Sequence, residues 1–130
     1  MILALDIGGT KLAAARVEGG RGVERREAPP PHDRGPEAVT RAALELLRPL
    51  LSGAKALGVA ATGSVAEGRV TALNADTLQG WRAYDLQGAL HEATGLPTAV
   101  LNDADAAAWG EAAYGAGRGV ENFIFVTVST

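Results

Sequence analysis

Two polar clusters, each directly after an apolar run, hold the residues of this sequence best suited to chemistry. The first reads Asp6-Ile7-Gly8-Gly9-Thr10-Lys11. Glycines leave backbone N–H groups open to phosphate oxygens, while a threonine hydroxyl and a lysine ammonium add further donors. An aspartate at a strand end, here Asp6, could hold Mg²⁺ or its waters. The alternative is a plain hairpin turn with a solvated lysine, because both the P-loop pattern and the helix of a Rossmann fingerprint are missing.

The second cluster, Leu101-Asn102-Asp103, stands where a strand gives way to a helix. Ligands of open α/β sheets gather at the carboxyl ends of strands, and a carboxylate placed there can accept the proton of a substrate hydroxyl. The Asn102 amide offers a donor and an acceptor for sugar hydroxyls. The alternative is helix capping, a task for which Asn and Asp are both favoured.

The hydrophobic pattern places both clusters in an α/β fold. Short apolar runs predict strands, glycine turns join the first three into an antiparallel meander, and apolar residues three or four apart predict helices. The expected strands are 2–7, 12–17, 23–28, 57–61, 98–101 and 122–128, with a hairpin over 65–73. One expected helix begins at Pro36 and ends near Ser52-Gly53, and two further helices cover 86–93 and 103–114. The order βββ-α-β-(hairpin)-α-β-α-β predicts one mixed sheet with helices on both faces.

Length and charge limit the classes of partner. The 130 residues fit one domain, and 12 Lys and Arg against 15 Asp and Glu give a formal net charge of −3. Without a basic surplus, neither nucleic acid nor an anionic membrane is an expected partner. The chain contains no cysteine, no apolar stretch of transmembrane length and no signal-peptide pattern at its start. These features predict a cytoplasmic protein without disulfides or cysteine-bound metal in these residues.

Taken in order along the chain, the motifs resemble the ROK family (repressors, open reading frames and sugar kinases). Residues 3–11 are similar to the family's first phosphate motif. The other similar segments are Ala61-Thr62-Gly63, Leu73-Asn74, Gly80-Trp81, Leu96-Pro97, Asn102-Asp103-Ala104, Gly115-Ala116-Gly117-Arg118-Gly119 and Thr127-Val128-Ser129-Thr130. Within the family, residues 12–15, 108–109 and 128–130 look most like bacterial N-acetylmannosamine kinases.

The resemblance implies an actin-like, ribonuclease H-like lobe, the first of two, with the active site between them. It implies that Asp103 is the general base that activates the 6-hydroxyl of a hexose and that Asp6 assists Mg²⁺. The residues implied to meet the ATP phosphates are Gly8, Gly9, Thr10 and Lys11, and those implied to hold the sugar are Gly63, Asn74, Asn102 and Asp103.

Several family segments do not occur in these residues: a second glycine-rich phosphate loop, a zinc segment with histidines and cysteines, and the glutamates of the sugar site. By resemblance, residues 1–130 are then the N-terminal lobe of a kinase that is homodimeric at full length. Zinc is expected only in the second lobe, and Mg²⁺ at Asp6 is the only metal expected here. The expected substrate is N-acetylmannosamine, with glucose as the alternative, and this chain alone is expected to be inactive. A non-catalytic sugar-binding or sensing module is the alternative from another functional class.

Overall fold

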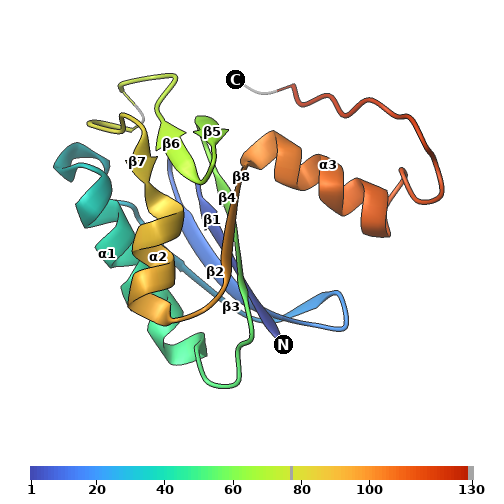
Figure 1. Cartoon of the computed structure of the whole chain (residues 1–130), viewed down its shortest axis with the longest axis horizontal. Helices are drawn as coiled ribbons and strands as arrows, with labels where there is room; N and C mark the ends of the chain where they lie inside the picture. The colour runs from blue at the N-terminus through green and yellow to red at the C-terminus, as the bar shows by residue number, and fades with distance from the viewer. Residues whose placement is uncertain (77, 129–130) are drawn as a thin grey trace.

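The computed structural model describes residues 1–76 and 78–128, and a five-stranded mixed sheet is its central element (Figure 1). Its strands are β1 (Ile2–Ile7), β2 (Leu12–Glu18), β3 (Arg21–Ala28), β4 (Leu57–Ala61) and β8 (Thr98–Asn102), in the order β3-β2-β1-β4-β8. The first three strands form an antiparallel meander, whereas β4 and β8 run parallel to β1. The α/β class and the mixed sheet predicted from the sequence are therefore confirmed.

Within the described residues, three helices and a second, smaller sheet complete the fold. The helices are α1 (Pro36–Leu47), α2 (Leu86–Thr94) and α3 (Asp103–Tyr114), with short 3₁₀ turns at η1 (His32–Arg34) and η2 (Arg48–Leu50). The small sheet contains β5 (Ser64–Ala66), β6 (Arg69–Thr71) and β7 (Tyr84–Asp85). The predicted hairpin is thus present as β5 and β6, and β7 adds a short third strand that the sequence pattern did not predict.

The core lies between the large sheet and the helices α1 and α2. On β1, Leu3, Leu5 and Ile7 are almost fully buried, while Ala4 and Asp6 between them face the other side, as the two-residue period of a strand requires. Asp85 caps the start of α2, where its carboxylate accepts a hydrogen bond from Gly88 N at 2.9 Å. Gly95 caps the end of the helix in the left-handed region (φ +71°). The helix predicted over 86–93 is therefore confirmed, and these two residues cap its ends.

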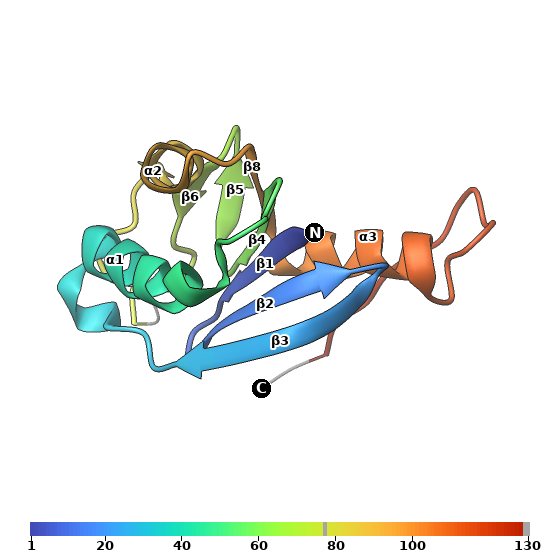
Figure 2. The same cartoon turned by 90° about the horizontal axis from the view of Figure 1, so that it is seen from below.

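The two faces of the large sheet are covered unequally. Helices α1 and α2 pack on one face, whereas α3 leaves the end of β8 on the other side and leans away from the sheet (Figure 2). None of the α3 residues is buried. The second face therefore has a helix beside it but remains largely open.

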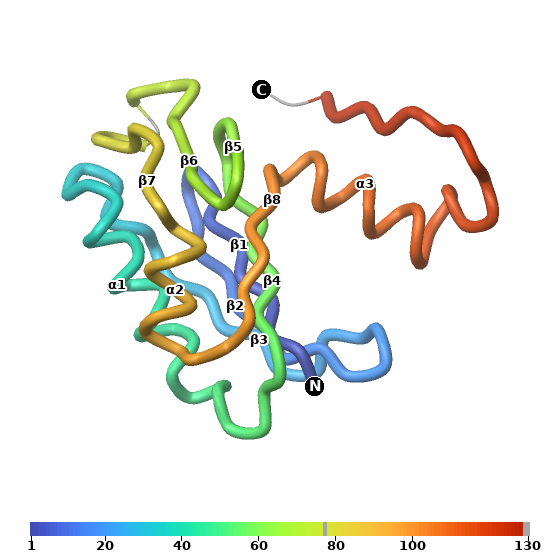
Figure 3. Tube along the Cα trace, in the orientation of Figure 1, coloured from blue at the N-terminus to red at the C-terminus, as the bar shows by residue number. Residues whose placement is uncertain are grey.

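One predicted element does not form. Residues 122–128 are strongly apolar, yet they are extended without strand pairing, and the trace turns back after α3 (Figure 3). A strand needs a neighbour for its backbone hydrogen bonds, and this segment has none among the residues that the structure describes. Its side chains are accordingly exposed, for example Ile124 at 89% and Val126 at 71%.

No helix within residues 1–76 and 78–128 combines the length and the apolar character that crossing a membrane requires.

Replacing Trp81 by alanine should destabilise the fold far more than the same change at Trp109. Trp81 is 2% exposed and stacks edge-to-face on Tyr84 with ring centroids 5.4 Å apart, whereas Trp109 is 66% exposed. We expect Trp81→Ala to lower the free energy of unfolding by about 3–5 kcal/mol. Trp109→Ala should change it by about 0.5 kcal/mol or less. Urea denaturation followed by circular dichroism measures both, and equal losses would contradict this packing.

Candidate active site

The carboxyl ends of β1 and β8 bring the two sequence clusters to one edge of the sheet. Because β1, β4 and β8 are parallel, Asp6 near the end of β1 and Asp103 just after β8 lie at the same edge. They border an open groove of about 590 Å³ over the uncovered face of the sheet. The floor of this groove is made of small residues, among them Ala4, Ala13 and Ala60, so the carboxylates stand at the rim of an apolar hollow.

The turn between β1 and β2 carries the predicted phosphate motif. Gly8 N donates a hydrogen bond to Lys11 O at 3.0 Å, which closes the turn. A Cβ at Gly8 would lie 3.1 Å from the same carbonyl oxygen, so the tight closure favours glycine there. Thr10 and Lys11 are exposed at the turn, where their side chains are open to a ligand.

Asn102 and Asp103 differ in what their side chains contact. The Asn102 Oδ1 atom accepts hydrogen bonds from Ala104 N at 3.0 Å and Asp105 N at 3.4 Å, so Asn102 caps α3. Its Nδ2 donates to Gly63 O at 2.7 Å, which leaves one amide hydrogen for a ligand. The capping alternative therefore describes Asn102, while Asp103 is exposed at the groove.

Two other predicted sugar residues have local roles. Gly63 adopts φ +109°, and a Cβ there would come within 2.7 Å of Thr71 O, so only glycine fits the step from β4 to β5. Asn74 lies in the loop between β6 and β7, where its Oδ1 accepts a hydrogen bond from Asp76 N at 2.9 Å. That loop stands at the same end of the molecule as the start of α3 (Figure 1). A role of either residue toward a sugar stays a prediction.

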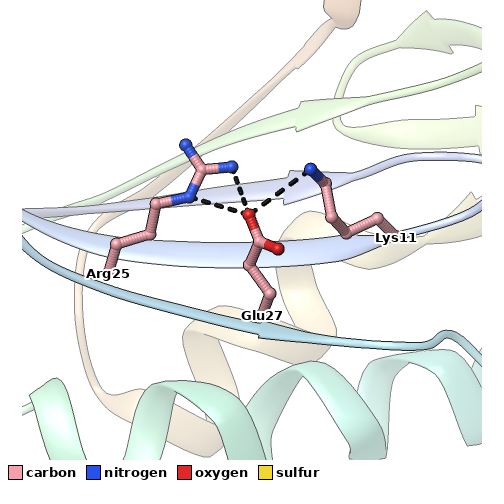
Figure 4. Close-up of polar contacts among 3 residues, drawn as sticks. All are labelled: Lys11, Arg25 and Glu27. Carbon is pink, nitrogen blue, oxygen red and sulfur yellow. Dashed lines mark hydrogen bonds and ion pairs between the residues drawn. The ribbon is translucent and has the colours of Figure 1, made fainter.

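The sequence patterns missed two residues on the edge strand β3. Glu27 Oε1 accepts hydrogen bonds from Arg25 Nε at 3.0 Å and Arg25 Nη2 at 2.6 Å, and it lies 3.3 Å from Lys11 Nζ (Figure 4). Arg25 also borders the groove with Asp6 and Asp103. The available signal was their spacing, because residues two apart on a strand share a face.

The charged side chains around the groove shift the pKa values of Asp6 and Glu27. Partial burial raises the pKa of Asp6, and the nearby Asp103 carboxylate raises it further, whereas Lys11 and Arg25 act in the opposite direction. The Arg25 guanidinium and then Lys11 hold the pKa of the Glu27 carboxyl below its usual value. Mg²⁺ is commonly held by one or two carboxylates together with substrate phosphates and waters, so the Asp6 carboxylate at the groove fits such an ion. Among the described residues, no three His, Asp or Glu side chains form a metal site of their own.

Comparison with known proteins agrees with this architecture. A model of the ROK family matches residues 2–130. The chain belongs to the ROK family. It is 44% identical over 129 residues to an N-acetylmannosamine kinase from Citrobacter koseri, with 98% of this chain and 44% of that protein covered. A second N-acetylmannosamine kinase, from Shigella flexneri, is 44% identical over 131 residues, with 99% of this chain and 44% of that protein covered.

Solved structures of ROK sugar kinases, whose fold is actin-like, have the same fold as this chain. The ROK family glucokinase from Streptomyces griseus, crystallised with glucose and AMPPNP, is 36% identical with a TM-score of 0.78 over 91% of this chain and 38% of that one. The inorganic polyphosphate/ATP-glucomannokinase from Arthrobacter sp. strain KM is 35% identical with a TM-score of 0.79 over 92% of this chain and 50% of that one. This chain thus spans half or less of the length of these relatives.

Replacing Asp103 by asparagine should lower the pKa of Asp6, because the variant removes a neighbouring negative charge that raises it. Asp105→Asn is the matched control, since Asp105 is not among the groups that act on Asp6. A carboxyl ¹³C NMR titration measures both variants, and an unchanged pKa in Asp103→Asn would contradict the proximity of the two carboxylates.

The raised pKa of Asp6 also determines how its contribution to stability changes with pH. The ordinary value for Asp6 is 3.8, and the folded chain binds this proton more tightly than the unfolded chain does. The contribution of Asp6 to stability therefore declines as the pH rises above 3.8 and through the folded-state pKa. Asp6→Asn should flatten that part of the stability profile.

Proposed function

We propose that this chain is the N-terminal lobe of an ATP-dependent kinase that phosphorylates the 6-hydroxyl of a hexose. The observation that carries the proposal is the position of Asp103, exposed at the carboxyl end of β8 and close enough to Asp6 to raise the pKa of that residue. The sugar kinases among the relatives support the same reaction class.

In the proposed reaction, Asp103 is the general base. Ala104 N donates a hydrogen bond to Asp103 Oδ1 at 2.8 Å, which orients the carboxylate and leaves Oδ2 without a partner among the described residues. Oδ2 then accepts the proton of the 6-hydroxyl. At the same time the hydroxyl oxygen forms a bond to the γ-phosphorus of ATP, and the bond from that phosphorus to the bridging oxygen of ADP breaks.

The other residues position the phosphates and the sugar. Lys11, Thr10 and the backbone N–H of Gly9 donate hydrogen bonds to phosphate oxygens, as glycine-rich turns do. Gly8, whose own N–H closes the turn on Lys11 O, is proposed to meet the phosphates without donating a hydrogen bond. Mg²⁺ neutralises charge on the phosphates when it is bound, and Asp6 is the residue here that would hold it or its waters. Gly63, Asn74 and the remaining amide hydrogen of Asn102 are proposed to contact the sugar.

The proposed substrate is N-acetylmannosamine, because the relatives at 41–44% identity are N-acetylmannosamine kinases. Glucose is the second candidate, since the structural relative from Streptomyces griseus was crystallised with it. A cytoplasmic enzyme that is homodimeric at full length, with any zinc in its second lobe, completes the proposal by family resemblance. ATP consumption by the full-length protein with a panel of hexoses tests it. Consumption that no hexose stimulates would instead support a sugar-binding module.

Asp103→Asn should abolish turnover of the full-length enzyme without unfolding it. The asparagine keeps the shape of the side chain but cannot accept the hydroxyl proton, and loss of a general base costs about 10²–10⁴-fold in rate. Asp105→Asn, two residues further along the first turn of α3, is the control and should retain activity. Near-normal turnover in Asp103→Asn, with folding checked by circular dichroism, would rule out the assignment of the base.

The 130-residue chain alone should show no significant kinase activity. Groups from a second lobe that stabilise the transferring phosphoryl group are needed in the proposed two-lobed enzyme, and positioning together with charge stabilisation provides most of the catalysis in phosphoryl transfer. A coupled assay for ADP, with the full-length enzyme as the reference, measures this. Turnover comparable to that reference would overturn the two-lobed proposal.

A further inference from the structure

A charged cluster of Lys11, Arg25 and Glu27 borders the proposed phosphate site (Figure 4). Two of its members, Arg25 and Glu27, have no role in the proposed reaction. We propose that Glu27 is a positioning residue that holds the Lys11 ammonium and the Arg25 guanidinium as a pair of cations for the phosphate chain of the nucleotide. This inference rests on the proposed kinase function and adds Arg25 to the residues that meet the phosphates.

Strand register places Glu27 between the two cations. Asp6 pairs with Ala13, and Ala13 pairs with Glu27, so these three residues form one row across the groove face of the sheet. Lys11, in the turn just before β2, precedes Ala13 by two residues, and Arg25 precedes Glu27 by two residues on β3. Because residues two apart on a strand share a face, Arg25 projects to the same side as Glu27 and Asp6. The 3.3 Å contact between Lys11 Nζ and Glu27 Oε1 places the Lys11 ammonium on that side too.

Stability gives little reason for this arrangement. The side chains of Lys11, Glu27 and Arg25 are 51%, 44% and 62% exposed, and exposed ion pairs are weakened by water and by the entropy of two long side chains. All three contacts nevertheless end on the single atom Glu27 Oε1. Without that carboxylate the two cations would repel each other, and the flexible lysine would be free to leave the turn.

Both cations keep hydrogen-bond donors for a ligand. Arg25 uses Nε and Nη2 for Glu27, so Nη1 remains, and Lys11 directs one of three ammonium hydrogens to Glu27. The three side chains together carry a net charge of +1, beside the turn where the phosphates are proposed to bind. Arg25 also borders the groove together with Asp6 and Asp103, so its positive charge lies beside the proposed site.

Glu27→Gln in the full-length enzyme separates positioning from simple charge screening. If Glu27 positions the cations, kcat should fall about tenfold while the KM for the hexose stays unchanged. If Glu27 only screened the cations, its neutralisation would lower the KM for ATP and leave kcat unchanged, and that result would overturn the proposal. Glu18→Gln is the matched control, because it removes an exposed ion pair with Arg16, 3.4 Å long, at the far end of β2.

Two further variants test whether Glu27 acts through Lys11. In a Lys11→Met background, Glu27→Gln should lower kcat by only about twofold, since coupled residues are not additive. Glu27→Asp keeps the charge but retracts the carboxylate from Lys11, so it should lower kcat as well. Equal losses in both backgrounds, or normal kcat in Glu27→Asp and Glu27→Gln alike, would overturn the positioning role.

A measurement without turnover keeps the inference distinct from the proposed function. Lys11 and Lys55 are the only lysines of this chain, so ¹³C-labelled lysine gives two sets of side-chain signals, assigned with Lys55→Arg. Glu27→Gln should move the Lys11 signals toward those of Lys55, and Glu18→Gln should leave them in place. Lys11 signals whose chemical shifts are the same in Glu27→Gln as in the wild type would overturn the proposal. If the wild-type enzyme consumed no ATP, the proposed function would fail and this result alone would decide whether Glu27 holds Lys11.

Discussion

Burial of one face of β1 decides which of its side chains can reach the groove. Leu3, Leu5 and Ile7 fill the core against α1 and α2, so the alternating residues, including Asp6, must face the other side. A slip of one residue would bury the Asp6 carboxylate and expose the leucines, which is strongly unfavourable. Since β8 is tied to β1 through β4 in a parallel arrangement, the same packing also brings Asp103 to that edge.

Small neighbours keep the groove open beside Asp6. Its register partners on the two adjacent strands are Ala13 and Ala60, and neither side chain extends beyond a methyl group. Larger residues at these two positions would fill the space that a ligand needs next to the carboxylate. On this face of the sheet, these two alanines therefore leave open the space beside the Asp6 carboxylate.

Local patterns predicted most elements well, whereas long-range pairing was harder to predict. The bounds of β1 and α3 agree with the sequence, because each depends on alternation or on capping residues within a few positions. The strand expected at 122–128 does not form, since its existence depends on a partner strand rather than on its own composition. Arg25 and Glu27 were missed for the same reason: their place beside Lys11 follows only once β3 is paired with β2.

Asn102 is what leaves Asp103 available for chemistry. A helix that begins at a strand end has free backbone N–H groups, and Asn102 accepts hydrogen bonds from Ala104 N and Asp105 N while its amide nitrogen holds the Gly63 carbonyl. Had Asp103 been the sole cap, its carboxylate would be turned back onto the helix and away from the groove. Instead one oxygen of Asp103 receives the Ala104 N–H, and the other is left at the rim beside Asp6. Helix capping and an exposed carboxylate, which the sequence offered as alternatives for this dipeptide, are therefore found on two adjacent residues, and the role proposed for Asp103 needs only the second.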